Sequence, residues 1–174
     1  SGGGVTQKLT QIILPKGKII QVETPESKIA YSKSGSSLTI DSGDEISQPL
    51  ESDEAYNTIV VPYGKRSQVT LTDNSTIWLN SGSKLVYPVR FAKDKREVYL
   101  EGEALFDVAH NESHPFYVVT KGLEIKVLGT VFDLSAYDED SAINTVLERG
   151  LVEVIYKKSL FGSSHTRLVP GKMA

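Results

Sequence analysis

The chain has 174 residues, a net charge of −3, 39% hydrophobic residues and 24% charged residues. This length and composition supply enough apolar surface for a stable core, which excludes a disordered protein. The basic residues are scattered, so the chain lacks the basic stripe with which nucleic-acid-binding proteins displace counterions from phosphates. The absence of cysteine excludes disulfides, thiolate metal sites and cysteine nucleophiles.

The first residues, Ser1–Gly4, are typical of a flexible linker or an expression remnant. No signal peptide and no apolar run of transmembrane length follows, and we expect the chain to be a soluble piece of a longer protein. Residues 5–56 predict a β-rich segment that includes a strand at Leu38–Ile40. The polar stretch Ser42–Ala55 predicts a long surface loop, which is a common place for partner contacts.

One internal repeat is visible in the sequence. The segment Ile12–Lys18, followed by Gln21-Val22, aligns with Ile59–Lys65, followed by Gln68-Val69. The repeat represents either a duplicated binding unit or a strand, a Pro-Gly bend and a second strand used twice. We favour the second interpretation because the matching residues form backbone structure and are not reactive groups.

The clearest hairpin spans Arg66–Asn80. Val69 and Leu71 alternate with polar residues in the first strand, and Ile77 and Leu79 alternate with polar residues and Trp78 in the second. Asp73-Asn74 lies between the two strands, and asparagine tolerates the left-handed conformation of a tight hairpin turn.

The rest of the chain repeats this pattern of short strands separated by glycine or proline, without helical periodicity. We therefore predict an all-β fold with little or no helix, an antiparallel β-sandwich of two curved sheets that is jelly-roll-like or a related closed architecture. The further predicted strands are Lys84–Tyr87, Glu97–Glu101, Ala104–Ala109, Phe116–Thr120, Leu123–Leu128, Val131–Tyr137, Ile143–Leu147, Val152–Tyr156 and Thr166–Val169.

The best enzymatic candidate is the pair Glu101 and Glu103. Residues two apart in a strand point to the same face, and paired carboxylates act as acid and nucleophile in jelly-roll glycoside hydrolases. The intervening Gly102 is also typical of a bend that separates such a pair. The alternative interpretation is therefore a polar strand edge that enters a turn.

Two histidines, His110 and His114, lie near Asp107 and Glu112. Histidines four apart form a zinc site chiefly on a helix, whereas Pro115 and the surrounding polar residues predict a loop here. The chain also lacks a nucleophile-elbow motif and a phosphate-binding glycine loop. We therefore assign no catalytic residue, no metal site and no cofactor.

Trp78, the only tryptophan, alternates with Ile77 and Leu79 and so points away from the side that they bury. It either packs against the second sheet or a covering loop, or it is exposed as an interface anchor. Tyr99, which alternates with Val98 and Leu100, has the same two interpretations. Trp78 and Tyr99 are thus the candidate interface residues.

From Asn57 to its end, the chain resembles the FecR domain of anti-sigma factors that are paired with TonB-dependent outer-membrane transporters. No single motif is specific, but the set in this order is. One departure is Asn74, where the family usually carries glycine after the aspartate. The matching segments are Asn57–Gly64, Val69–Asn80, Ser83–Pro88, Phe91, Arg96–Val108, His114–Phe116, Val127–Leu134, Gly150–Val154 and Leu168–Gly171.

The resemblance implies a FecR domain over residues 57–174, after the linker and the N-terminal β-rich segment. The family's signature positions are mostly residue types that build turns and cores, so we expect them to be structural. In this sequence they are Pro62, Gly64, Asp73, Trp78, Leu79, Asn80, Gly102, Glu103, Phe106, Pro115, Phe116, Gly129, Thr130, Phe132 and Gly150.

The resemblance also implies a function without catalysis and without a cofactor. Intact relatives place a small helical domain in the cytoplasm, where it binds an extracytoplasmic-function sigma factor, and a single inner-membrane helix then leads to this periplasmic domain. The implied partner is the periplasmic signalling domain of a TonB-dependent transporter in a Gram-negative bacterium, and nucleic acid is not a partner. The alternative is a carbohydrate-binding or glycan-degrading jelly roll that uses Glu101 and Glu103.

Overall fold

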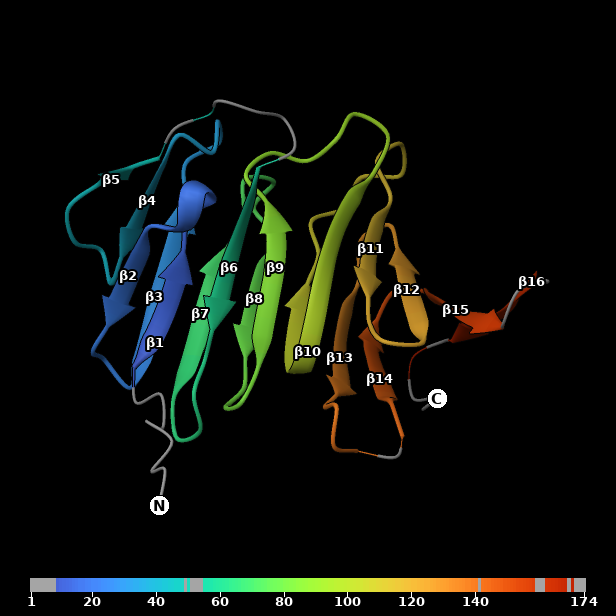
Figure 1. The fold of residues 1–174 in the computed structure, drawn as a ribbon. Coiled ribbons are helices and arrows are strands. Elements are labelled where there is room, and N and C mark those ends of the chain that lie inside the picture. Colours follow the sequence, from blue (N-terminus) through green and yellow to red (C-terminus); the bar gives the residue numbers. More distant parts are fainter. Residues whose placement is uncertain are drawn as a thin grey trace, which may run out of the picture.

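A computed structural model describes residues 9–48, 50, 55–140, 142–158, 162–168 and 170. Sixteen strands and one short 3-10 turn, η1 (Pro15–Gly17), make up its regular structure, which confirms the all-β expectation (Figure 1). Among the described residues, no helix is long and apolar enough to cross a membrane.

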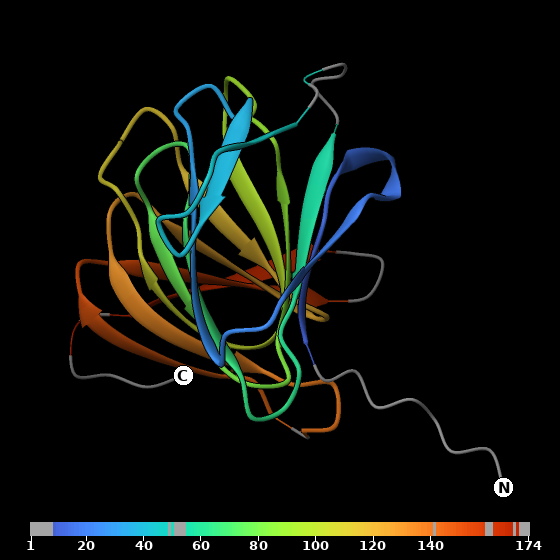
Figure 2. The same ribbon diagram turned by 90° about the vertical axis from the view of Figure 1, so that its left-hand side faces the viewer.

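The strands form two curved sheets, which we name sheet A and sheet B, and both sheets include part of β10 (Arg96–Asp107) (Figures 1 and 2). Sheet A contains, in spatial order, β2 (Ile19–Val22), β1 (Thr10–Ile13), β6 (Tyr56–Val60), β9 (Lys84–Pro88), the first part of β10, β11 (Phe116–Val119), β12 (Leu123–Val127), β15 (Val152–Lys158) and β16 (Gly162–Leu168). Sheet B contains β5 (Ile46–Ser47), β4 (Ser37–Ile40), β3 (Glu26–Tyr31), β7 (Arg66–Thr70), β8 (Thr76–Leu79), the second part of β10, β13 (Val131–Ala136) and β14 (Asn144–Arg149).

Strand β10 folds over at Gly102 and so passes from one sheet to the other. Before Gly102 it pairs with β9 and β11, and after Gly102 it pairs with β8 and β13. Arg96 donates from Nη1 to the carbonyl oxygen of Ala109 at 2.7 Å, although these residues are thirteen positions apart. A straight strand would separate them by about 43 Å. The contact therefore requires that β10 doubles back at Gly102.

The backbone at Gly102 and the side chain of Ser83 make this corner. Gly102 has φ +96°, and a Cβ atom at this position would lie 2.4 Å from Ser83 Oγ. Ser83 Oγ accepts a hydrogen bond from the amide of Glu103 at 2.9 Å and donates to the carbonyl of the same residue at 3.0 Å. Only glycine combines this conformation with so close an approach. The separate strands expected on either side of Gly102 are therefore one bent strand.

The sequence predicted antiparallel pairing, but two pairs of strands in the structure are parallel. Strand β10 pairs in parallel with β11, and β3 pairs in parallel with β7. Parallel neighbours usually need a long crossover because the chain must return to the end at which it started. The corner in β10 makes this return itself, so the short connection of residues 108–115 is sufficient and no helix is needed.

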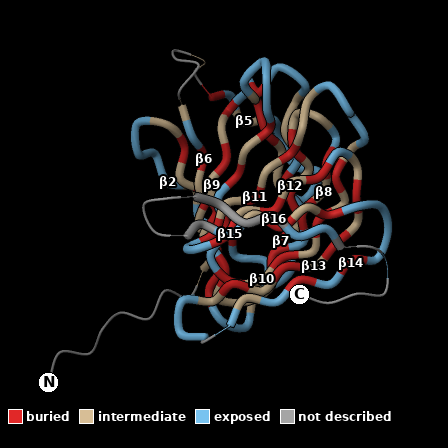
Figure 3. The backbone as a smooth tube through the Cα atoms, turned by 90° about the vertical axis from the view of Figure 1, so that its right-hand side faces the viewer, coloured by how far each residue is buried: buried red, intermediate tan, exposed pale blue. Residues whose placement is uncertain are grey.

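The core lies between the two sheets, and buried and more exposed residues alternate along the strands (Figure 3). Phe106 and Phe132 stack at 4.9 Å between ring centroids, and Phe116 packs against Phe106 edge-on at 6.5 Å. All three rings are fully buried. Because they come from β10, β11 and β13, they connect the two sheets through apolar contacts.

The N-terminal strands are part of the same two sheets. Strand β1 pairs with β6 and β3 pairs with β7, so residues before position 57 hydrogen-bond to residues after it. The two copies of the repeat pair with each other, with Ile12 opposite Ile59. Their bends share a left-handed glycine, Gly17 at φ +84° and Gly64 at φ +82°. This geometry supports the strand–bend–strand interpretation. The division into a segment ending at residue 56 and a domain beginning at residue 57 stays a prediction.

Among the described residues, Arg96 is the largest fully buried side chain, and it connects several loops at one end of the molecule. Its guanidinium donates to Asp73 Oδ2 at 2.8 Å and to the carbonyl oxygens of Ala109, His114 and Leu128 at 2.7, 2.7 and 3.3 Å. These acceptors lie in the β7–β8 turn and in the connections that follow β10 and β12. The carboxylate and the three carbonyls together satisfy a charge that is otherwise costly to bury.

We expect the substitution Gly102→Ala to lower the free energy of unfolding by about 2–5 kcal/mol, because strain at positive φ adds to the overlap with Ser83. Gly64→Ala is the matched control, since Gly64 also has positive φ but a Cβ there meets no atom within 4 Å. Its expected cost is about 1–2 kcal/mol. Urea denaturation measures both values, and equal costs would contradict the sharp corner.

We expect Asp73→Ala to lower the free energy of unfolding by about 3–5 kcal/mol, because it leaves the guanidinium of Arg96 buried without its counter-charge. Asp138→Ala removes an exposed carboxylate and should change stability by less than about 0.5 kcal/mol. Thermal or urea denaturation at pH 7 measures both. If Asp73→Ala were as mild as its control, Arg96 would not depend on this carboxylate.

Candidate functional site

The outer face of sheet B carries a groove with a volume of about 500 Å³. Five neighbouring strands contribute to its floor, namely β3, β7, β8, β10 and β13. The register places one outward residue from each strand in a single row across the sheet. In spatial order this row is Lys28, Gln68, Trp78, Leu105 and Asp133.

Trp78 lies in the centre of this row and is 39% exposed, whereas its neighbours Ile77 and Leu79 are buried in the core. Gln68 is its cross-strand partner on β7 and Leu105 on β10. The interpretation in which Trp78 packs beneath the second sheet or a covering loop is therefore wrong. Its role as an interface anchor stays a prediction.

At one end of the groove, Glu103 and Asp133 form a carboxyl–carboxylate pair. The pKa of Asp133 is raised from 3.8 to about 6, first by burial, then by the charge of Glu103 and its hydrogen bond with Asp133, and last by the charge of Glu148 on β14. Asn80 donates from Nδ2 to Glu103 Oε1 at 2.8 Å and so holds this carboxylate in place. Asp133 therefore keeps its proton to a higher pH than an ordinary aspartate.

The predicted partnership of Glu101 with Glu103 is not the one that the structure forms. Both side chains point outward, but Glu101 lies in sheet A opposite Lys84, whereas Glu103 lies in sheet B beyond the corner at Gly102. The observed partner, Asp133, is in direct hydrogen-bonding contact. Glycoside hydrolases hold their two carboxyl groups about 5 Å or more apart, so the Glu103–Asp133 pair lacks that geometry.

The opposite end of the groove is lined by Lys28 and Arg66, with Glu26 beside them. Within the described parts of the chain, the side chains of Lys28, Arg66, Gln68 and Trp78 form no hydrogen bond or ion pair. The groove therefore presents a basic end, an apolar centre and an acidic end, and its free donors are available to a ligand.

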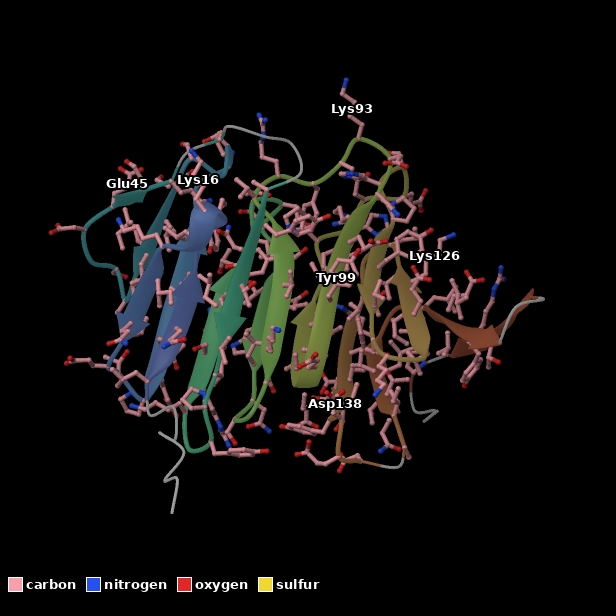
Figure 4. The ribbon with its side chains drawn as sticks, viewed as in Figure 1. Lys16, Glu45, Lys93, Tyr99, Lys126 and Asp138 are labelled. Atoms are coloured by element: carbon pink, nitrogen blue, oxygen red, sulfur yellow. The ribbon has the colours of Figure 1, made fainter. Side chains whose placement is uncertain are left out.

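Tyr99, the second candidate interface residue, lies on the outer face of sheet A, which faces the viewer in Figure 4. It is 39% exposed, packs edge-on against Tyr56 at 6.5 Å and donates from its hydroxyl to Glu97 Oε1 at 2.6 Å. This hydrogen bond, more than burial, raises the pKa of Tyr99 to about 12. Trp78 and Tyr99 thus lie on opposite outer faces and do not form one site.

The two histidines lie in the loop between β10 and β11, as expected. His110 is exposed, with Nε2 3.7 Å from Glu112 Oε1, whereas the His114 ring contacts the carbonyl oxygen of Ala92. In the portion of the chain that the structure describes, no three His, Asp or Glu side chains are grouped closely enough to hold a metal ion.

Comparison with known proteins identifies the family. The FecR protein family matches residues 57–153, which is 97 of the 174 positions. The chain belongs to the FecR family. No curated protein matches the chain.

Two crystal structures of a candidate anti-sigma factor from Parabacteroides distasonis ATCC 8503 are similar to this FecR protein. One is 38% identical with a TM-score of 0.64, and the match covers 68% of this chain and 53% of that one. The other is 39% identical with a TM-score of 0.63, and the match covers 67% and 52%. The FecR chain therefore spans about half the length of these solved relatives.

Most FecR signature residues lie in turns or in the core rather than in the groove. Gly64 and Gly150 adopt positive φ in turns, and a Cβ on Gly129 would lie 2.6 Å from His110. Thr130 is buried and donates from Oγ1 to the carbonyl of Leu151 at 3.1 Å. The signature residues that line the groove are Trp78, Leu79, Asn80 and Glu103.

Sequence reasoning missed Arg96 and Asp133. Arg96 occupies an inward position of β10, in phase with Val98 and Leu100. A charged residue in the apolar phase of a strand is a signal for a buried ion pair, but it does not identify the partner. Asp133 occupies an outward position, which is ordinary for a carboxylate, and only the β10–β13 register brings it to Glu103.

We expect the stability of the protein to fall as the pH rises from about 4 to about 6. The folded state binds the proton of Asp133 more tightly than the unfolded chain, so this contribution is present below pH 4 and is lost above pH 6. Asp133→Asn should flatten this part of the profile and raise the melting temperature at pH 7.5. Urea denaturation from pH 4 to pH 8 measures the effect.

The control for this measurement is Glu101→Gln, which removes an exposed carboxylate of the same strand β10 on the other sheet. It should leave the shape of the pH profile unchanged. A profile that Asp133→Asn does not alter would show that the folded state does not bind the proton of Asp133 more tightly than the unfolded chain.

Proposed function

We propose that this FecR domain is the periplasmic sensor part of a transmembrane anti-sigma factor. In this proposal it relays the state of a TonB-dependent outer-membrane transporter to an extracytoplasmic-function sigma factor through protein–protein contacts. The sigma factor binds a separate cytoplasmic domain of the intact protein, and a single inner-membrane helix connects the two sides. The domain is not an enzyme, uses no cofactor and binds no nucleic acid.

The observation that carries this proposal is the combination of family membership with similarity to the Parabacteroides distasonis structures. The geometry of the acidic residues also supports a function without catalysis. The Glu103–Asp133 pair is too close for glycoside hydrolysis, and Glu101 lies on the other sheet. Contacts with proteins need no such site.

Exposed sheet edges offer a physical means for such contacts. Within the described residues, β2, β5, β14 and β16 each pair with only one neighbouring strand. An edge strand has unpaired amide and carbonyl groups, and a strand of a partner can add to it through backbone hydrogen bonds. β14 also carries Val146, which is 39% exposed and lies opposite Asp133. We propose β14 as the edge that a partner strand extends.

We expect saturable binding when this chain is titrated with the periplasmic signalling domain of the transporter encoded beside it. The measurement is isothermal titration calorimetry at pH 7.5. Val146→Lys should weaken binding at least about tenfold, because a charge replaces an apolar contact at the edge. Ile19→Lys, on the edge strand β2 of the other sheet, is the control and should leave the affinity unchanged.

If this chain does not bind but a longer chain extending past Ala174 does, the contact surface lies outside these residues and the domain is a spacer. Absence of binding by both chains would refute the receptor-contact proposal.

A further inference from the structure

We propose that the groove on sheet B is a docking site for an extended peptide segment of a protein partner, in which an arginine or lysine lies beside an apolar residue. The basic side chain occupies the Glu103–Asp133 end of the groove and the apolar side chain covers Trp78 and Leu105. This inference deepens the proposed function and rests on it, because it adds to the β14 edge a second contact surface on the same sheet and names the partner chemistry that this surface binds.

The dimensions of the groove suit a short peptide. Its floor crosses five strands from β3 to β13, which are four intervals of about 4.8 Å, or about 19 Å in all. An extended peptide advances about 3.3 Å per residue, so about six residues span this row. The volume of about 500 Å³ is within the range of binding sites for small ligands and short segments.

The centre of the groove has the properties of an interface hot spot. Trp78 and Leu105 are direct cross-strand partners, and together they expose an apolar surface in the middle of an otherwise polar row. Tryptophan residues in concave sites contribute much of the binding energy of protein interfaces. The indole Nε1 makes no hydrogen bond within the described residues, so it is free to donate to a peptide carbonyl.

The charges of the groove select a basic side chain. Glu103 on β10, Asp133 on β13 and Glu148 on β14 converge at one end, and among the described residues no cation pairs with any of them. The basic residues that line the groove, Lys28 and Arg66, belong to β3 and β7, and Arg149, which follows Glu148 on β14, lies 3.6 Å from Asp107. An arginine of a partner would compensate the acidic end with charge-assisted hydrogen bonds and lie near the face of Trp78.

The same features disfavour a neutral sugar as the occupant. An indole with amide and carboxylate neighbours is suitable for stacking and hydrogen bonding a sugar ring. A neutral ligand, however, would leave the repulsion between Glu103, Asp133 and Glu148 uncompensated, and burying these charges further would be costly. The basic peptide removes this repulsion, which is why the observations favour it.

The experiment is a selection of random hexapeptides displayed on phage against the immobilised 174-residue chain at pH 7.5. We expect arginine or lysine next to an apolar residue to be enriched about tenfold over the unselected library. Synthetic versions of the selected peptides should change the emission of Trp78, which as the only tryptophan reports this groove alone. Their affinity should fall about tenfold between pH 7.5 and pH 5, because protons compete with the peptide for the carboxylate of Asp133.

The double variant Glu103→Gln/Asp133→Asn keeps the shape of the pair and removes its charge, and it should bind these peptides at least about tenfold more weakly. Glu101→Gln, on the other sheet, should bind them as the unmodified chain does. Thermal melting of each variant verifies that it is folded. No enrichment of basic residues, or binding that the double variant leaves unchanged, would overturn the proposal. The proposal would also be overturned if a neutral oligosaccharide changed the emission of Trp78 saturably and none of the selected peptides did.

Failure of this proposal and failure of the proposed function are distinguishable. If the transporter domain binds the double variant as tightly as the unmodified chain, the groove is not the contact surface although the function stands. If selected peptides bind but the transporter domain does not, the groove is a basic-peptide site and the assignment of the partner is wrong.

Discussion

The buried guanidinium of Arg96 is the interaction on which the rest of this structure depends. Burying a guanidinium in an apolar interior costs several kcal/mol of free energy unless its donors find acceptors. The acceptors of Arg96 come from the turn before β8 and from the connections after β10 and β12. Asp73 is itself held by Ser75, whose amide donates to Oδ1 and whose hydroxyl donates to Oδ2. The loops at this end of the molecule are therefore fixed relative to one another by one charge.

The corner at Gly102 is the second constraint, and it determines where the groove lies. Because β10 enters sheet B between β8 and β13, it brings Glu103 and Leu105 between Trp78 and Asp133. These residues are far apart in sequence and come together only through the register of the sheet. The groove is thus a product of the topology, and the acids and the indole have no local motif that would mark them as neighbours.

The sequence was sufficient to predict what alternation and turn chemistry determine. The structure confirms three predictions: the hairpin, whose turn has Asn74 at φ +68°, the orientation of Trp78 on the face opposite Ile77 and Leu79, and the all-β class. Strand β3 was missed because Ser27 occupies one of its inward positions, where it contacts Ser67 at 2.6 Å instead of supplying an apolar signal. The short strand β5 lies in the expected loop, part of which is outside the described residues. The parallel pairs and the carboxyl pair depend on long-range register, which no local pattern encodes.

The shared strand also has a mechanical consequence. In most sandwiches the two layers are joined by loops and by packing, so a load on one layer reaches the other through contacts that can slide. Here β10 belongs to both layers and is hydrogen-bonded to a neighbouring strand on each side in both of them. A movement of sheet B around Trp78 is therefore transmitted through the covalent backbone of β10 to sheet A, which contains Tyr99. A pull on either layer is therefore a pull on both.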